Sequence, residues 1–282
     1  MTADSTSSPP PGSSFNPNQA TISRTYADFR GGANDTFTAD REATKELRAV
    51  IERVDEVAQE NAAALVRAVR HLAKAGHDQY ADLGCGRPMQ GLDALKLPDL
   101  AILAKGIQPD CRWLALDSDE LVVTACRALL RLPGIDVAQK DLRNVDAVLD
   151  AIAMHLDLTV KPIVVLLGAV VHFMTDEEAS ALMSGLRACL APGSIVVLTH
   201  VTSEGVEPEV VAAGKATYKK RHGVDIYVRT REEIASFADG FVIRAPGIGR
   251  TIDFMPEEDS RAPVREAPHF LMWMAERPHE SA

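Results

Sequence analysis

Apolar residues recur at three- and four-residue steps between Ala39 and Gly76. This spacing predicts helix packed along one face, and the length of the span predicts a break into two helices. Gly76 stands where a residue in the left-handed conformation would end the second helix. Residues 1–20 are instead rich in Ser, Pro, Thr and Asn and have few apolar positions, so we expect a disordered tail there.

Beyond residue 76 the pattern alternates between short β-rich runs and helical stretches, which is typical of βαβ units and a parallel sheet. The predicted strands are Gln79–Leu83, Arg112–Asp117, Asp136–Lys140, Pro162–Leu167 and Ser194–Thr199. The run IVVLLGAVV from residue 163 shows no alternation, as in a strand buried on both faces. Capping boxes at Thr175 with Glu178 and at Thr230 with Glu233 predict the starts of two helices.

The end of the chain departs from this alternation. Phe241–Ala245 and His269–Ala275 predict two more strands, and the segment between them carries several Pro and Gly residues and no helical stripe. We therefore expect these two strands to pair antiparallel at one edge of the sheet. The resulting fold class is α/β, a Rossmann-like parallel sheet that ends in an antiparallel hairpin.

Charge and composition narrow the function classes. Lys and Arg number 30 against 40 Asp and Glu, which gives a net charge of −10 and a pI near 5.3. Such a surface repels phosphate backbones, and 5% aromatic residues suggest no platform for stacking bases, so no nucleic acid partner is expected. The basic run at residues 219–222 is interpreted as a solvated helix face.

The cysteines and apolar runs bear on the compartment. The four cysteines show no metal-ligand spacing and are interpreted as free thiols in a reducing compartment, so a cytoplasmic location is expected. No leader segment is visible at the N-terminus, and the longest apolar run is too short to cross a membrane. The histidines show no spacing typical of a metal site, and we expect none.

A Gly-rich loop follows the first predicted strand, in the segment Ala81–Gly86. Gly84 and Gly86 allow a tight turn and a close approach of backbone to a ligand, although an ordinary strand-to-helix turn would look similar. The third glycine of a dinucleotide fingerprint is replaced by Met89. The acid before the glycines would repel a pyrophosphate and attract a cationic amino acid group. The predicted ligand contacts in this loop are Asp82, Leu83, Gly84 and Gly86.

Three later strand ends carry similar candidates. Asp117 can accept hydrogen bonds from ribose hydroxyls, with Ser118 beside it, while Asp119 is assigned to the cap of the next helix. After the third strand, Asp141 can accept from an adenine amino group while Leu142 packs on the ring. Gly168 leaves space at the end of the fourth strand. Because the carboxyl ends of parallel strands share one edge of a sheet, these residues are predicted to form one site.

Several segments resemble the actinobacterial S-adenosylmethionine (SAM)-dependent methyltransferase family once catalogued as a domain of unknown function. The similarity extends from Ile22 to Glu276. The segments that carry it are Arg24-Thr25-Tyr26, Gly31–Asp35, Ala39–Glu42, Val171–Phe173, Leu190–Ser194 and Arg229–Ile234. The usual D-I-G-T-G becomes D-L-G-C-G, and Ala27 and Ala33 replace an aspartate and a lysine of the family pattern.

The resemblance implies a class I methyltransferase fold, SAM as cofactor and an N-terminal helical cap over the cofactor site. It divides the chain into a tail at residues 1–20, a helical cap at 21–76 and a SAM-binding domain at 77–278. The acid before the glycines also favours SAM over a nicotinamide cofactor. Three alternatives stay open: a SAM-binding protein that does not methylate, such as a cyclase or regulator, an NAD(P)-dependent reductase, and a purely structural or interaction protein.

Methyl transfer needs an aligned acceptor and, for some acceptors, a general base. His172, after the fourth strand, is the first candidate for the base, and His200 is the second; a structural role for His172 is equally compatible with the sequence. Tyr26 is a candidate to orient the acceptor or the SAM carboxylate, or to pack within the cap. The acceptor is expected to be a small molecule, with a secondary metabolite as the hypothesis, bound between the N-terminal helices and residues 201–228. The acceptor atom (oxygen, nitrogen or carbon) and any homodimer are left open.

Overall fold

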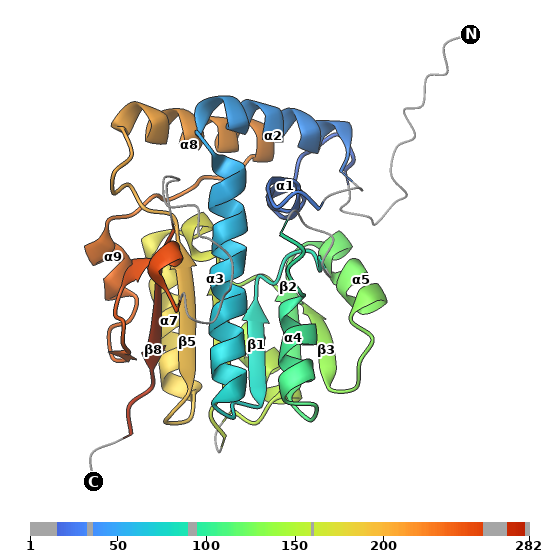
Figure 1. The fold of residues 1–282 in the computed structure, drawn as a ribbon, viewed down its shortest axis with the longest axis vertical. Helices are drawn as coiled ribbons and strands as arrows, with labels where there is room; N and C mark the ends of the chain where they lie inside the picture. The colour runs from blue at the N-terminus through green and yellow to red at the C-terminus, as the bar shows by residue number, and fades with distance from the viewer. Residues whose placement is uncertain (1–15, 33–35, 90–94, 159–160, 256–269, 280–282) are drawn as a thin grey trace.

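The computed structural model describes residues 16–32, 36–89, 95–158, 161–255 and 270–279. A central sheet stands between two layers of helices, and further helices lie across one end of the sheet (Figure 1). The helices are α1 (Ile22–Phe29), α2 (Thr38–Val50), α3 (Val54–Lys74), α4 (Leu100–Ile107), α5 (Glu120–Leu129), α6 (Val145–His155), α7 (Asp176–Cys189), α8 (Pro208–His222) and α9 (Arg231–Ser236). Two short 3₁₀ helices are η1 (Val171–Phe173) and η2 (Thr251–Asp253). No helix in these described ranges is both long and apolar enough to cross a membrane.

The sheet has the strand order β3-β2-β1-β4-β5-β8-β6, with β7 paired to β8. Its strands are β1 (Gln79–Leu83), β2 (Arg112–Asp117), β3 (Ile135–Gln139), β4 (Val164–Gly168), β5 (Ile195–His200), β6 (Val242–Ile243), β7 (Gly249–Arg250) and β8 (Leu271–Glu276). The first five are parallel, and β8 runs antiparallel between β5 and β6. The α/β class and the antiparallel ending are confirmed. The chain moves outward from β1 to β3 and then returns to β4, so the order reverses between β1 and β4, where ligands bind in such sheets.

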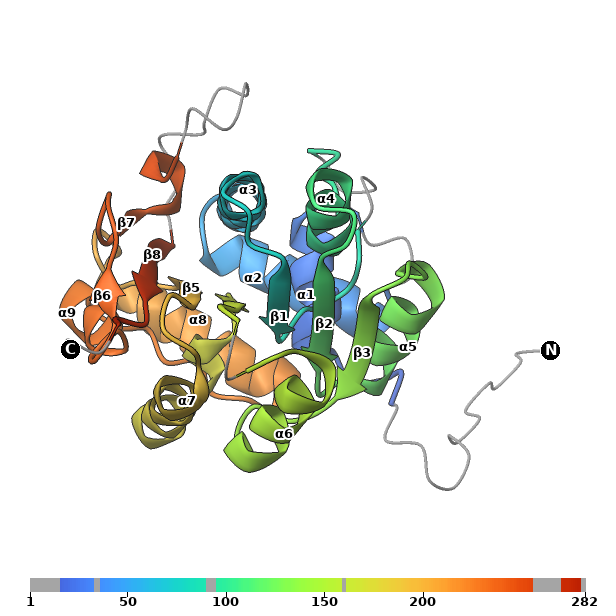
Figure 2. The same ribbon diagram turned by 90° about the horizontal axis from the view of Figure 1, so that it is seen from below.

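Both faces of the sheet are covered (Figure 2). Helices α3 and α4 pack on one face, where Val69 of α3 is buried in one cluster with Tyr80 and Trp113. The rings of Tyr80 and Trp113 stack there with their centroids 5.0 Å apart. Helices α6, α7 and α9 pack on the other face, around Leu83 and Leu116. Every residue of β4 except its last is buried, as its unbroken apolar run predicted.

The N-terminal helical stripe forms two helices, as expected. The break falls at residues 51–53, where Arg53 adopts a positive φ of 57°, and Gly76 follows α3 with a φ of 96°. Helix α3, however, packs along the sheet through its apolar face, so it belongs to the three-layer body as much as to a cap. The cap over the strand ends consists of α1, α2 and α8 (Figure 1).

The two capping boxes predicted from the sequence are present in the structure. Thr175 and Thr230 each accept a hydrogen bond from the backbone of the glutamate three residues later, so both capping boxes form. The basic run lies in the last turn of α8, where Lys220 and Arg221 pair with Glu46 of α2. Two residues of the basic run therefore join α8 to α2, while Lys219 pairs with Asp225. The predicted tail falls mostly, at residues 1–15, outside the described residues, as do Ala33, Asn34 and Asp35 of the family-like segment and His269 of the last strand.

Candidate functional site

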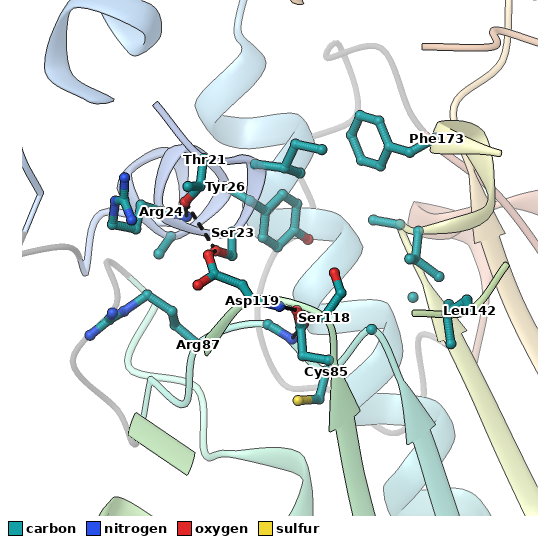
Figure 3. A pocket seen from close by; sticks show the side chains of 18 of the residues that line it. Thr21, Ser23, Arg24, Tyr26, Cys85, Arg87, Ser118, Asp119, Leu142 and Phe173 are labelled. Carbon is teal, nitrogen blue, oxygen red and sulfur yellow. Dashed lines mark hydrogen bonds between the residues drawn. The ribbon is translucent and has the colours of Figure 1, made fainter. Parts of the chain in front are cut away.

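A cavity of about 550 Å³ lies at the carboxyl ends of the parallel strands, beneath the cap. The loops after β1, β2, β3 and β4 line it from below, and α1 and the end of α8 line it from above. Figure 3 shows Tyr26 and Phe173 on opposite sides of this space, with Cys85 and Ser118 on the strand side. Segments separated by more than a hundred residues thus meet at one site, as the strand-end argument predicted.

The loop after β1 is shaped by its glycines. Gly84 has a φ of 77°, and a Cβ there would lie 2.6 Å from Cγ2 of Val170. Gly86 has a φ of 65°, and its backbone nitrogen donates to Oδ2 of Asp117 at 3.0 Å. Both positions disfavour any other residue, Gly84 through contact as well as backbone conformation. The result is a backbone cradle in which Gly84, Cys85 and Gly86 line the cavity.

The end of β2 supplies two carboxylates with different tasks. Asp117 accepts hydrogen bonds from the backbone nitrogens of Gly86 and Asp119, and it lines the cavity together with Ser118. Asp119 accepts from the backbone nitrogen of Leu121 and caps α5, as expected. Each oxygen of Asp117 keeps a second lone pair, because a carboxylate offers about four acceptor sites. Asp117 can therefore accept further hydrogen bonds from a ligand.

The floor of the cavity brings three carboxyl groups together. Burial, together with the nearby carboxylates of Asp99 and Asp117, raises the pKa of Asp82 to about 8. Burial also raises the pKa of Asp99 and that of Asp117 above their usual value. Three acids that resist ionisation in one enclosed space favour a cationic ligand, because a cation stabilises their charged forms.

The loop after β3 contributes Asp141 and Leu142 to the cavity wall. Asp141 forms a bidentate ion pair with Arg143, which holds the pKa of its carboxyl below the usual value. Leu142 is 7% exposed and presents an apolar surface there. Asp141 is therefore an ionised acceptor at the rim, beside an apolar contact suited to a flat ring.

The end of β4 forms the opposite wall. A Cβ on Gly168 would lie 2.7 Å from Cδ1 of Leu65 on α3, so the glycine allows this helix to approach. The next residue, Ala169, has a φ of 54°, a conformation that an L residue rarely adopts. Its backbone nitrogen donates to the Thr199 side chain on β5 at 2.9 Å. Strain of this kind often accompanies functional sites.

Two buried histidines lie at the ends of this strand and its neighbour: His172 follows β4, and His200 is the last residue of β5. Their ring centroids are 5.5 Å apart. Nε2 of His200 lies 2.8 Å from the Arg229 guanidinium, which can only donate, so Nδ1 carries the hydrogen and donates to the Val201 carbonyl at 2.6 Å. Burial lowers the pKa of His200 to about 3. Both nitrogens of His200 are occupied, and this second candidate for the base is not free to accept a proton.

His172 differs from its neighbour. It lines the cavity, is 3% exposed, and its Nδ1 has no hydrogen-bond partner among the described residues. Burial and the neighbouring His200 and Arg229 hold the pKa of His172 well below 6.5. Its imidazole is therefore neutral at physiological pH and can accept a hydrogen bond from a ligand.

Arg229 fixes this part of the site. Its buried guanidinium donates to the carbonyls of Val171 and Met174 on either side of His172 and pairs with Asp176 at 2.7 Å. The 3₁₀ turn that carries His172 is thus tied to the segment after α8. Sequence reasoning noted Arg229 only as part of a family-like segment.

Tyr26 projects from α1 into the cavity (Figure 3). Its hydroxyl donates to the Ala58 carbonyl at 3.1 Å and accepts from the Asn61 amide at 2.7 Å. These contacts with α3 hold the ring in place and occupy the hydroxyl. These hydrogen bonds are typical of a residue that packs within the cap. Because the hydroxyl is occupied, Tyr26 would orient an acceptor through its ring, which lines the cavity.

The two family-like cap segments contact each other. Arg24 and Asp40 form an ion pair at 2.6 Å with both side chains at most 1% exposed. Asp40 also accepts from the backbone nitrogens of Thr21 and Phe37. This carboxylate therefore organises the start of α1 and the start of α2 around one buried guanidinium. The ion pair gives a structural reason for the arginine in the first family-like segment and for the aspartate in Ala39–Glu42.

Several cavity residues were not identified from the sequence, and two of them carry polar contacts that shape the site. Ser23 of α1 donates to Oδ2 of Asp119 at 3.0 Å, which joins the cap to the end of β2 (Figure 3). Asp99 caps α4 by accepting from the backbone nitrogen of Ala101. The only local signal for Asp99 is its position before an apolar run. One predicted contact lies elsewhere: the Leu83 side chain packs in the core against α6 and α7 and does not line the cavity.

The other predicted cofactor contacts all line the cavity. They are Asp82, Gly84, Gly86, Asp117, Ser118, Asp141, Leu142 and Gly168. The residues suit a nucleoside that carries a cationic amino acid group: carboxylates at the floor and at the end of β2, a glycine cradle that a Cβ would fill, and an apolar surface at the rim.

Comparison with known proteins gives a consistent result. A family model described as S-adenosyl methyltransferase matches residues 10–277. A candidate methyltransferase from Thermobifida fusca is similar with a TM-score of 0.83 and 28% identity, covering 96% of this chain and 99% of that one. A DUF574 family protein from Streptomyces avermitilis has a TM-score of 0.81 and 26% identity, covering 92% and 98%. A search of curated proteins found no match.

More distant structures share the fold alone. Magnesium protoporphyrin IX methyltransferase from Synechocystis, solved with bound S-adenosylhomocysteine, has a TM-score of 0.51 and 16% identity, covering 85% of this chain and 95% of that one. The family match decides between the alternatives that the sequence left open, and it agrees with the acidic floor of the cavity. This chain belongs to the S-adenosyl methyltransferase family and is a SAM-dependent methyltransferase.

Proposed function

We propose that the enzyme transfers a methyl group to a small molecule held beneath the cap. The observation that carries this proposal is the single cavity of about 550 Å³ that the strand-end motifs and the cap helices line together. Its volume is in the range of small-molecule sites. Because α1 and α8 line it from above, an acceptor that is part of a large polymer would meet these helices before the strand ends. The net charge of −10 further disfavours a nucleic acid acceptor.

The cofactor would be held by the residues that the motifs supply. Asp82 would face its ammonium group, Asp117 and Ser118 its ribose, and Asp141 and Leu142 its adenine. The glycines at 84 and 86 bring backbone close to the ligand. When bound, SAM supplies an electrophilic methyl group on a sulfonium.

The acceptor would lie between Gly168, His172 and Tyr26, all of which line the cavity. The neutral imidazole of His172 would accept a hydrogen bond from an oxygen or nitrogen acceptor and so orient its lone pair. The low pKa of His172 makes orientation a better-supported role than strong proton abstraction. Our hypothesis for the acceptor is a secondary metabolite.

Calorimetry tests the cofactor assignment. Wild-type protein should bind SAM and S-adenosylhomocysteine and not NAD. Asp117→Asn should weaken S-adenosylhomocysteine binding about tenfold or more, because it removes charge-assisted hydrogen bonds. The matched control Asp150→Asn changes an exposed acid on α6 and should leave binding unchanged. Equal affinity of the two variants would remove Asp117 from the site.

Isotope transfer tests the acceptor class. Protein incubated with methyl-labelled SAM and an extract of small molecules and macromolecules should place the label in the small-molecule filtrate. His172→Ala should lower the rate, and cofactor affinity should stay the same. Label recovered in protein or nucleic acid would refute the proposal, whereas the cofactor assignment would stand.

A further inference from the structure

A second cavity, which we call the side cavity, adjoins the large one. Its volume is about 130 Å³, and it lies between α3, α8 and the segment after β5. Five residues line both cavities, and we call them the passage residues: Tyr26, Val201, Tyr218, Ile226 and Phe270. The side cavity therefore lies directly beside the place assigned to the methyl acceptor.

The wall of the side cavity is almost entirely apolar. Valines from three parts of the chain contribute to it: Val54, Val57, Val206, Val210, Val211 and Val228. In the described part of the chain, Lys215 is the one charged residue on its border, and Lys215 is exposed. A cationic ligand group placed there would lose its hydration without gaining an opposite charge, and an anionic group would have only the exposed Lys215 at the border.

The polar atoms of the passage residues do not change this character. The Tyr26 hydroxyl already donates to Ala58 and accepts from Asn61. Burial raises the pKa of Tyr218, so its phenol remains neutral. The Tyr218 ring lies 5.9 Å from that of Phe173 and 5.1 Å from that of His222, so aromatic faces lie where the two cavities adjoin.

We propose that the side cavity holds the apolar part of the methyl acceptor, and that the acceptor is an uncharged molecule with one ring or a short branched hydrocarbon group. A dry apolar cavity of similar size, roughly 150 Å³, binds benzene in another protein, so the volume here suits one six-membered ring. The nucleophilic atom of the same molecule then lies in the large cavity near Gly168. This inference rests on the proposed transfer to a small molecule and adds its chemical class.

Cavity-filling variants test the inference. Gly214 on α8 lines the side cavity, and a Cβ there would lie 3.4 Å from Cδ1 of Ile51, so a larger side chain would enter the space. Gly214→Leu and Val210→Phe fill the side cavity from two positions. Ala213→Leu adds the same side chain as the first variant at an exposed neighbouring position outside the cavity and serves as the control.

The probe is p-cresol, added to protein saturated with S-adenosylhomocysteine and followed by ligand-observed NMR. Wild type and Ala213→Leu should bind it, and Gly214→Leu and Val210→Phe should bind it about tenfold more weakly. The charged probe 4-hydroxybenzoate should bind wild type about tenfold more weakly than p-cresol. Equal binding of p-cresol to filled and unfilled proteins, equal binding of the two probes, or no binding of p-cresol to wild type would each overturn the inference.

Cofactor affinity, measured for every variant, separates this inference from the proposed function. Preserved S-adenosylhomocysteine binding shows that a filled variant is folded, and loss of p-cresol binding alone then supports the side cavity as the acceptor subsite. If both filled variants fail to fold, the comparison of p-cresol with 4-hydroxybenzoate on wild-type protein still decides. A labelled small-molecule product that is charged throughout would overturn the inference and leave methyl transfer to small molecules intact.

Discussion

Asp82 should lose a proton when the cofactor binds. In the ligand-free protein its pKa is about 8, because the carboxyl is buried at the cavity floor beside Asp99 and Asp117. At pH 7 roughly nine-tenths of the molecules therefore carry a protonated Asp82. A cationic ammonium placed against this carboxyl favours its charged form, so the pKa falls in the complex and the proton is released.

The magnitude follows from that pKa. Only the ionised fraction binds the cation well, so the affinity for the cofactor should rise about tenfold per pH unit below pH 8, which is about 1.4 kcal/mol per unit. The measurement belongs at pH values from roughly 6 to 7.5, where an α-ammonium group is still largely charged. An ordinary surface acid is already ionised in this range and would give no such pH dependence.

Calorimetry in two buffers of different ionisation enthalpy measures the protons released on binding of S-adenosylhomocysteine. Wild type should release nearly one proton per site at pH 7. Asp82→Asn should bind more weakly, release few protons and show a flat pH dependence. A wild-type complex that forms without proton release, or an Asp82→Asn complex that releases as many protons as wild type, would show that Asp82 does not face the cation.

Three further variants or conditions give measurable outcomes. Gly84→Ala should lower both the free energy of unfolding, measured in urea, and the free energy of cofactor binding, measured by calorimetry, by about 2 kcal/mol, because it combines a strained φ with a 2.6 Å contact. At Gly86 the φ is also positive but a Cβ would meet nothing within 4 Å, so Gly86→Ala should lower both free energies by about half as much. Equal losses in the two variants would refute the contact argument. Arg229→Met should lower the free energy of unfolding by about 3–5 kcal/mol, because His200 Nε2 and the Met174 carbonyl are buried acceptors that would lose their donor. A loss below about 1 kcal/mol would show that the 3₁₀ turn keeps its conformation without Arg229. Burial lowers the pKa of His200 to about 3 and that of His222 to about 4, so the unfolded chain binds protons first as the pH falls below about 6.5. These histidines therefore destabilise the folded protein between about pH 6.5 and 4, whereas the raised pKa values of Asp82, Asp99 and Asp117 act in the opposite direction over this range. His222→Gln removes one histidine contribution, so its stability to urea should rise relative to that of wild type as the pH falls from about 6.5 to 4; a constant difference would contradict the assignment to His222.

The sheet was largely predictable because each parallel strand is a short β-rich run, and the first four end at motifs that line the cavity. The predicted Gln79–Leu83 and Arg112–Asp117 match β1 and β2 in full, and the next three strands shift by one or two residues. The two-residue β7 was missed, since two residues carry no periodic pattern. Helix α3 was expected in the cap, because an amphipathic stripe shows that a helix packs on one face but not which partner it meets.

The part of the site that lies at the carboxyl ends of the parallel strands was predictable from the sequence. Asp82, Asp117 and Asp141 converge because parallel strands place their carboxyl ends at one edge. Leu83 was misplaced because successive side chains of a strand point to opposite faces. The contact between Ser23 and Asp119 joins residues 96 positions apart, and the tautomer of His200 depends on Arg229. No local pattern carries such information.

The hydrogen bond from Ser23 to Asp119 has a consequence for cofactor binding. It fastens α1 to the same strand end that would hold the ribose, so the position of the cap helix and the shape of the ribose site are coupled. A hydrogen bond to a charged group contributes about 1.5–3 kcal/mol, which favours this position of α1. Binding at that strand end and docking of α1 would then reinforce one another, and Ser23→Ala would hold the nucleoside more weakly.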